Sequence, residues 1–138
     1  MRSSICRTTL LLVTSSSPDT QHSTDLADYA CLGFAYWAPG HEWVFKGPGG
    51  ATEAVAVHGP LTVNIGHALR MAALAGLGII LQPRILLQDD IDKGLLIPLL
   101  PDWRHASRPM HLLTAPDRRR TRKLGSFVEF IARRFPLR

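Results

Sequence analysis

The chain has 138 residues, of which 46% are hydrophobic and 20% charged, and its formal net charge is +5 at pH 7. This length fits one domain of about 100–150 residues, and the hydrophobic fraction excludes an intrinsically disordered chain. The two cysteines, Cys6 and Cys31, exclude a disulfide-dense secreted scaffold. The apolar stretch Leu10–Val13 is too short for a secretory signal, and no stretch approaches the about 20 apolar residues of a membrane-spanning helix. We therefore expect a folded cytoplasmic protein without a membrane partner.

The first half of the chain predicts short strands and one hairpin. A strand-like segment is followed by a polar Ser/Thr/Pro/Asp connector, and further apolar or alternating segments come after it. The glycine-rich turn Gly47–Gly50 separates two of them and predicts a hairpin. The strands are expected at 5–13, 30–36, 42–46, 52–57 and 59–63.

From Asn64 the apolar period changes to that of a helix. Its predicted buried face contains small residues, which fits a helix lying close against a sheet. The Asn64 side chain is expected to cap the first turn, while Gly76 and Gly78 form the C-terminal cap and the exit turn. The expected buried residues are Ala68, Leu69, Ala72 and Ala73.

The rest of the chain alternates strands and helices. Gly78–Leu81, closed by Gln82–Pro83, is typical of a strand buried on both faces, and Pro98 places a later strand at a sheet edge. The last helix has an apolar stripe formed by Leu124, Phe127, Val128, Ile131 and Phe135. The expected elements are a strand at 78–81, a helix at 84–93, strands at 95–100 and 110–115, and a helix at 121–135. This order predicts an α/β fold.

Signatures of enzymes, metals and cofactors are absent from the sequence. His41–Glu42 lacks the second histidine of a zinc-binding HExxH motif, and the six histidines show no ligand spacing. Gly76–Leu77–Gly78 lies between a helix and a strand, the reverse of the order in a dinucleotide fingerprint. We expect no catalytic residue, no metal site and no cofactor, because no nucleophile, base and orienting group occur together.

Two segments could bind anions. If Asn64 begins a helix after a strand, the backbone N–H groups of Ile65, Gly66 and His67 point outward at the carboxyl end of a sheet, where anions bind. The alternative is that Asn64 only caps its helix. The basic run Arg118–Lys123 could face phosphates, although a solvated loop at a helix start is the simpler interpretation.

The stretch from Asp25 to Phe135 resembles the C-terminal half of the effector-binding region of LysR-type transcriptional regulators, in particular their large proteobacterial branch. The matching segments occur in the family's order and at its spacing. They are Asp25–Leu32, Trp43–Phe45, Pro60–Asn64, Ala72–Pro83, Gly94–Trp103 and Leu124–Phe130.

The resemblance implies one lobe of a periplasmic-binding-protein-like (type 2) domain, with a mixed sheet flanked by helices. Residues 23–108 would be the second lobe, 1–22 an atypical crossover segment, and 109–138 a returning strand and C-terminal helix that in the family pack on the first lobe. It also implies a small-molecule effector, a carboxylate or aromatic metabolite. The implied effector-binding residues are Asn64, Ile65, Gly66, Gln82, Pro83, Phe34 and Tyr36.

Three departures from the family pattern shape the expected function. No helix-turn-helix precedes the match, the first lobe is missing, and Arg2–His22 does not resemble the crossover segment. We therefore expect a truncated or frame-shifted regulator fragment, or one with a false start. It should be an effector-binding domain that binds its ligand weakly or not at all by itself, does not bind specific DNA sequences, and behaves poorly or self-associates when alone. Two alternatives are an interaction subunit that pairs with full-length LysR-type regulators, and a small basic nucleic-acid-binding protein that uses Arg118–Lys123.

Overall fold

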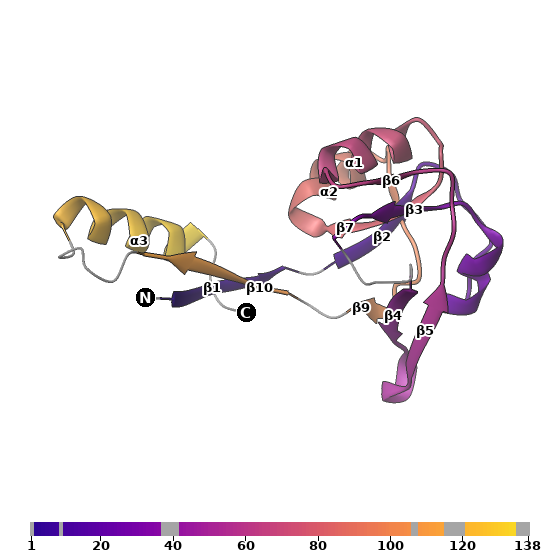
Figure 1. The fold of residues 1–138 in the computed structure, drawn as a ribbon, viewed down its shortest axis with the longest axis horizontal. Helices are drawn as coiled ribbons and strands as arrows, with labels where there is room; N and C mark the ends of the chain where they lie inside the picture. Colours follow the sequence, from indigo (N-terminus) through magenta and orange to yellow (C-terminus); the bar gives the residue numbers. More distant parts are fainter. Residues whose placement is uncertain (1, 9, 37–41, 106–107, 115–120, 135–138) are drawn as a thin grey trace. The chain divides into compact units, whose positions relative to one another are not determined.

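A computed structural model of the chain describes residues 2–8, 10–36, 42–105, 108–114 and 121–134. The chain forms two compact units. The larger unit comprises residues 9–106, and the smaller unit comprises residues 1–8 together with 107–138 (Figure 1). A mixed sheet flanked by helices confirms the predicted α/β fold class.

A mixed sheet of five strands forms the centre of the larger unit. Its order is β6-β3-β7-β2-β8, in which β3 runs parallel to β6 and β7, whereas β2 runs antiparallel to β7 and β8. The first four residues of β7 are all buried, as the continuous apolar run predicted. The strands are β2 (Leu10–Thr14), β3 (Cys31–Phe34), β6 (Thr62–Val63), β7 (Ile79–Pro83) and β8 (Ile97–Pro98).

Two helices, α1 (Gly66–Leu74) and α2 (Arg84–Asp92), cover one face of this sheet (Figure 1). Each ends in the same kind of turn around a glycine with positive φ, Gly76 at 78° and Gly94 at 69°. In both turns the N–H two residues after the C-cap donates to a carbonyl five residues earlier, at 3.0 and 2.8 Å. The predicted C-terminal turn at Gly76 and helix end at Gly94 are therefore confirmed. The core on this face contains Val13, Leu32, Leu69, Ala72, Ala73, Ile80, Leu87 and Leu96.

A smaller three-stranded sheet covers the opposite face, in the order β5-β4-β9 (Figure 1). Its strands are β4 (Glu42–Lys46), β5 (Thr52–Ala56) and β9 (Arg104–His105), and the predicted hairpin between β4 and β5 is confirmed. Trp43 and Phe45 alternate with exposed residues along β4 and point into the second core. That core also contains Leu26, from the 3-10 helix η1 (Ser23–Asp28). A short 3-10 turn, η2 (Pro48–Gly50), closes the hairpin.

The smaller unit contains an antiparallel ribbon and the last helix. Strands β1 (Arg2–Thr8) and β10 (Arg108–Leu113) pair from Arg2↔Leu113 to Thr8↔Arg108. The helix α3 (Arg122–Arg134) lies against β1 and begins after Thr121, whose Oγ1 accepts from the N–H of Leu124 at 3.3 Å. None of its described residues is buried. Phe135, part of the predicted stripe, lies outside the described residues.

The strand predicted at 95–100 is shorter than expected. Only Ile97–Pro98 pairs with β2, at the sheet edge where Pro98 was predicted to lie. The N–H groups of Leu95 and Leu96 instead donate to the carbonyl of Asp90 and close α2. Leu100 then turns the chain with a φ of 50°. Turn bonds therefore replace strand pairing at Leu95 and Leu96, and the turn at Leu100 ends the segment.

Candidate functional site

Parallel strands of the five-stranded sheet end together at one edge of the larger unit. The last residue of β3, Phe34, lies opposite the last residue of β6, Val63, and the N–H of Ala35 donates to the carbonyl of Val63 at 2.9 Å. Next to β3, the strand β7 ends at Gln82 and Pro83. Ligands of open α/β sheets bind at such carboxyl ends. Three of the candidate residues, Phe34, Gln82 and Pro83, therefore lie at this edge.

Helix α1 starts at this edge, but Asn64 does not cap it. The helix begins at Gly66, its N-cap is Ile65, and no side-chain hydrogen bond closes its first turn. The carbonyl of Ile65 accepts from the N–H groups of Ala68 and Leu69, at 3.1 and 3.3 Å. The predicted Asn64 cap is therefore wrong, because Ile65 keeps an extended conformation and moves the helix start beyond the reach of Asn64.

Gly66 brings the start of α1 close to the end of β7. A Cβ atom on Gly66 would lie 2.8 Å from Gln82 Oε1 and 3.1 Å from a methyl group of Leu86. A larger residue would therefore push the Gln82 amide away from the first turn of α1. The structure thus brings together Gly66 and Gln82, two of the predicted site residues from separate elements.

Gln82 is the most unusual polar residue at this edge. Its side chain is 2% exposed, and its Nε2 has no hydrogen-bond partner in the described part of the chain. Buried amide groups almost always find partners, because an unpaired one costs about 1–3 kcal/mol. A polar group in this condition beside the first N–H groups of a helix is suited to bind an acceptor from a ligand.

The remaining predicted residues surround this pair. Phe34 and Tyr36 form an edge-to-face contact with ring centroids 5.9 Å apart, and the Tyr36 side chain is 74% exposed. Asn64 and Ile65 are exposed between β6 and α1. Pro83 is half-buried and is the N-cap of α2.

An ion pair holds the two helices together behind this edge. The guanidinium of Arg70 on α1 donates two hydrogen bonds to the carboxylate of Asp90 on α2, of which the bond from Nη2 to Oδ1 is 2.7 Å long. These hydrogen bonds lower the pKa of Asp90, which is 2% exposed. The spacing of α1 and α2 is therefore fixed by a charged pair as well as by packing.

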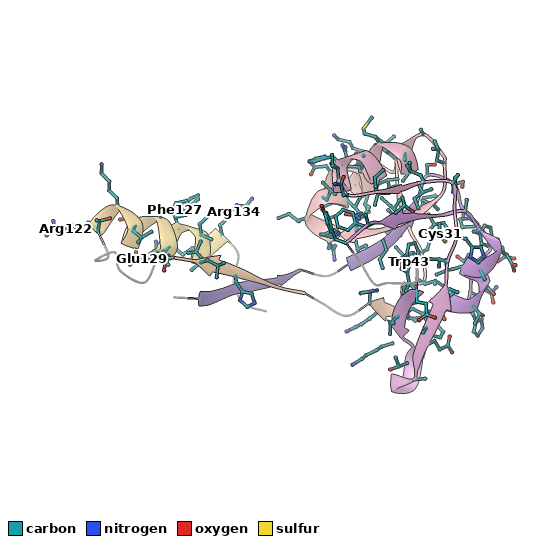
Figure 2. All side chains as sticks on the ribbon, viewed as in Figure 1. Cys31, Trp43, Arg122, Phe127, Glu129 and Arg134 are labelled. Carbon is teal, nitrogen blue, oxygen red and sulfur yellow. The ribbon has the colours of Figure 1, made fainter. Side chains whose placement is uncertain are left out.

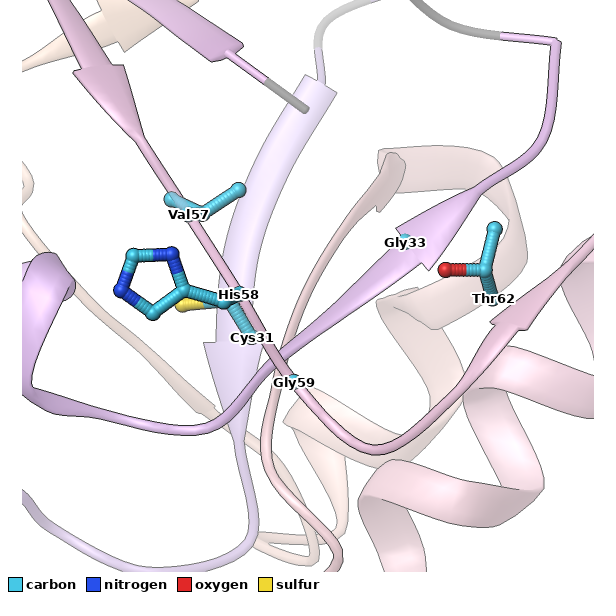
Figure 3. Close-up of a pocket in the computed structure, with 6 residues that line it drawn as sticks. All are labelled: Cys31, Gly33, Val57, His58, Gly59 and Thr62. Carbon is cyan, nitrogen blue, oxygen red and sulfur yellow. The ribbon is translucent and has the colours of Figure 1, made fainter. Parts of the chain in front are cut away.

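The structure also contains a small pocket that the sequence did not indicate. Its volume is about 180 Å³, and Figure 3 shows the chain at Gly59 crossing β3 at Cys31, with Thr62 on the other side of the crossing. A Cβ on Gly59 would lie 2.2 Å from the Cys31 carbonyl oxygen, so this crossing requires glycine. Burial raises the pKa of the Cys31 thiol to about 12, which keeps it protonated and poorly nucleophilic. The signal that could have identified the pocket is Gly59 itself.

Other sequence expectations concern metals, membranes and the basic run. No group of three or more His, Cys, Asp or Glu residues within the described ranges is placed to hold a metal ion. No described helix has the length and hydropathy needed to cross a bilayer. Arg118–Arg120 lie outside the described residues, whereas Arg122 and Lys123 are exposed at the start of α3.

Known proteins match both the sequence and the fold. The family model described as LysR substrate binding domain matches residues 3–136. The HTH-type transcriptional regulator CrgA of Neisseria meningitidis serogroup B is 29% identical over 112 residues, which cover 80% of this chain and 37% of CrgA. The HTH-type regulator YhjC of Escherichia coli is 36% identical over 74 residues, which cover 54% of this chain and 25% of YhjC. The chain thus spans little more than a third of the first of these relatives.

Solved structures give the same answer. The regulatory domain of AphB from Vibrio vulnificus superposes with a TM-score of 0.79 at 25% identity, and the match covers 95% of this chain and 68% of that one. The resemblance predicted from the sequence segments is therefore confirmed. Since the family model covers nearly the whole chain and the fold agrees with a LysR-type regulatory domain, this protein belongs to the LysR substrate binding domain family.

Proposed function

We propose that the chain binds a small carboxylate effector at the edge formed by the ends of β3, β6 and β7, as the effector-binding part of a transcriptional regulator. The observation that carries this proposal is the buried Gln82 amide. Its Nε2 has no partner among the described residues, and the amide lies beside the first turn of α1. The relatives CrgA and YhjC are named as transcriptional regulators, which supports the regulatory role. In this proposal, residues 23–108 act as the second lobe and 109–138 as the strand and helix that return to the first.

The predicted residues divide into three roles in this site. The N–H groups at the start of α1 and the Gln82 amide donate to the carboxylate, because both present donors without partners inside the helix or the core. Phe34 and Tyr36 pack against an aromatic body of the effector. Asn64, Ile65 and Pro83 form the margin of the site.

The proposal is tested by calorimetric titration of the full chain with a panel of aromatic and aliphatic carboxylates, benzoate among them, and with the matching neutral amides. We expect carboxylates to bind more tightly than their amides. We expect the variants Gly66→Ala and Gln82→Met to weaken the best carboxylate at least about tenfold, or about 1.4 kcal/mol. The matched control is Gly125→Ala in α3, where a Cβ would meet nothing within 4 Å. Unchanged affinity in both site variants, or equal binding of carboxylates and amides, would contradict the proposal.

We also propose that the chain associates with another copy of itself through α3. Phe127 and Phe130 are 52% and 63% exposed, and Leu113 on β10 is 73% exposed. Figure 2 shows Phe127 and Arg134 on the side of α3 that faces away from the ribbon. Each large apolar side chain left in water forgoes about 1.5–3 kcal/mol of burial, and when the chain is alone other copies supply the missing apolar surface.

Light scattering coupled to size-exclusion chromatography tests this association. We expect the mass of the wild-type chain to rise with concentration and the double variant Phe127→Ser/Phe130→Ser to lower it. The control is Val44→Ser on β4, which removes another exposed apolar side chain, 43% exposed, from the larger unit. A wild-type chain that stays monomeric at every concentration contradicts the association.

A further inference from the structure

A second groove lies in the larger unit on the β2–β8 side of the sheet. Its volume is about 340 Å³, and it shares none of its lining with the candidate effector residues. Small-molecule sites commonly have volumes of about 300–1,000 Å³, with mostly apolar walls and a few placed polar groups. The groove has this composition, since apart from two arginines every residue that lines it is apolar.

The groove exists because β8 covers only part of β2. Within the described sheet, β8 pairs with Val13 and Thr14 alone, and the N–H of Leu99 adds one further bond to the carbonyl of Leu12 at 2.9 Å. Pro98 has no N–H to extend the pairing. The apolar side chains at the uncovered part of β2 and at Leu99 therefore line an opening instead of a continuous sheet.

The turn after β8 holds the groove open. Leu100 is 3% exposed and has a φ of 50°, a left-handed conformation that leucine rarely adopts, and its carbonyl accepts from the N–H of Trp103 at 2.9 Å. The Trp103 ring is held in place, because a Cβ on Gly47 would lie 2.6 Å from it and the His22 ring lies 6.3 Å away between centroids. Trp103 thus forms a fixed aromatic wall.

The charged residues of the groove are both cations. Arg84 follows β7 on α2, and Arg104 lies on β9. Arg84 Nε donates to Gln88 Oε1 at 2.5 Å, and neither guanidinium forms an ion pair with a carboxylate among the described residues. Among the residues that the structure describes, no acidic side chain lines the groove. An apolar wall with two uncompensated cations fits a ligand that has an apolar body and one anionic group.

We propose that this groove is a second ligand site of the protein, which binds an aliphatic carboxylate with its chain along the leucine wall and its carboxylate at Arg84 and Arg104. This site does not depend on the effector site at Gln82, because the two have separate linings. A regulator with both sites responds to two small molecules.

The test uses the full chain labelled with ¹⁵N and titrated with octanoate, while the indole N–H signal of Trp103 is followed by NMR. We expect a saturable shift of this signal and a dissociation constant at least about tenfold below that of 1-octanol, which lacks the charge. The variant Arg84→Gln/Arg104→Gln should remove this preference for octanoate. The matched control Arg122→Gln/Lys123→Gln removes two exposed cations from α3 and should leave binding unchanged.

A third variant tests the apolar wall of the groove without changing its charges. Ile91→Phe places a larger side chain in the groove wall and should weaken octanoate and octanol alike. Three results would overturn the proposal: equal binding of octanoate and octanol, unchanged affinity in the double arginine variant, and octanoate-induced shifts confined to residues around Gln82 or Phe127. Shifts around Gln82 would show that the anion uses the effector site, whose own test does not involve Trp103.

Discussion

Replacement of Gln82 by methionine should change the free energy of unfolding and the carboxylate affinity in opposite directions. Gln82 is 2% exposed and its Nε2 has no hydrogen-bond partner within the described ranges, so the folded state bears the cost of an unpaired buried donor, about 1–3 kcal/mol. Methionine has the same unbranched length and no donor to satisfy. We therefore expect Gln82→Met to raise the free energy of unfolding by about 1–2 kcal/mol and to weaken carboxylate binding at least about tenfold.

The assay is thermal and urea unfolding followed by the fluorescence of Trp43, which is 6% exposed. For a unit of about 100 residues, each kcal/mol corresponds to a rise in Tm of roughly 4–8 °C. The control is Gln21→Leu in the exposed connector, where we expect a change within about 0.5 kcal/mol. If Gln82→Met destabilises the chain instead, the amide contributes to the fold, and the interpretation of Gln82 as a donor kept for a ligand is refuted.

Three further predictions concern the packing and ionisation of the larger unit. Gly59→Ala should unfold it, because the new Cβ would lie 2.2 Å from the Cys31 carbonyl oxygen. The control Gly125→Ala lies in the smaller unit, where a Cβ would meet nothing within 4 Å, and should leave the Trp43 melts unchanged. The hydrogen bonds from Arg70 lower the pKa of Asp90, so this pair stabilises the fold above about pH 4, and its contribution is lost as the pH falls further. In melts at decreasing pH, the Tm of Asp90→Asn should therefore fall less steeply than that of the wild-type chain. Burial raises the pKa of Cys31 to about 12, so mass spectrometry should find Cys31 unmodified by iodoacetamide in the folded chain at neutral pH and alkylated in urea.

Features that depend on local chemistry could be predicted from the sequence. Gly76 and Gly94 each end a helix because only glycine readily adopts positive φ at that position, and each is recognisable from the apolar period that stops before it. The alternation along Glu42–Lys46 and the Gly47–Gly50 turn together specify a hairpin and its buried face. In these cases the residues that decide the structure are neighbours in the chain.

Features that depend on distant contacts could not be predicted in this way. Asn64 is a good capping residue, yet the extended conformation of Ile65 places the helix start one residue too far for its side chain. The missing partner of Gln82 Nε2 and the crossing of Gly59 over Cys31 both arise between elements that are far apart in the chain. The family resemblance indicated Gln82 as a site residue, but its unpaired amide is visible only in the folded chain.

Ligand binding and self-association should respond to different mutations. All the candidate effector residues belong to the larger unit, which has two apolar cores of its own, whereas α3 in the smaller unit has no buried residue. Phe127→Ser/Phe130→Ser should therefore reduce the mass measured by light scattering without changing carboxylate affinity. Gln82→Met should lower carboxylate affinity without changing that mass. If the phenylalanine variant also loses the carboxylate, the binding site requires the associated state, and the larger unit is not sufficient to form it. Equal carboxylate affinity over a concentration range in which the mass changes would show that each copy binds its ligand independently.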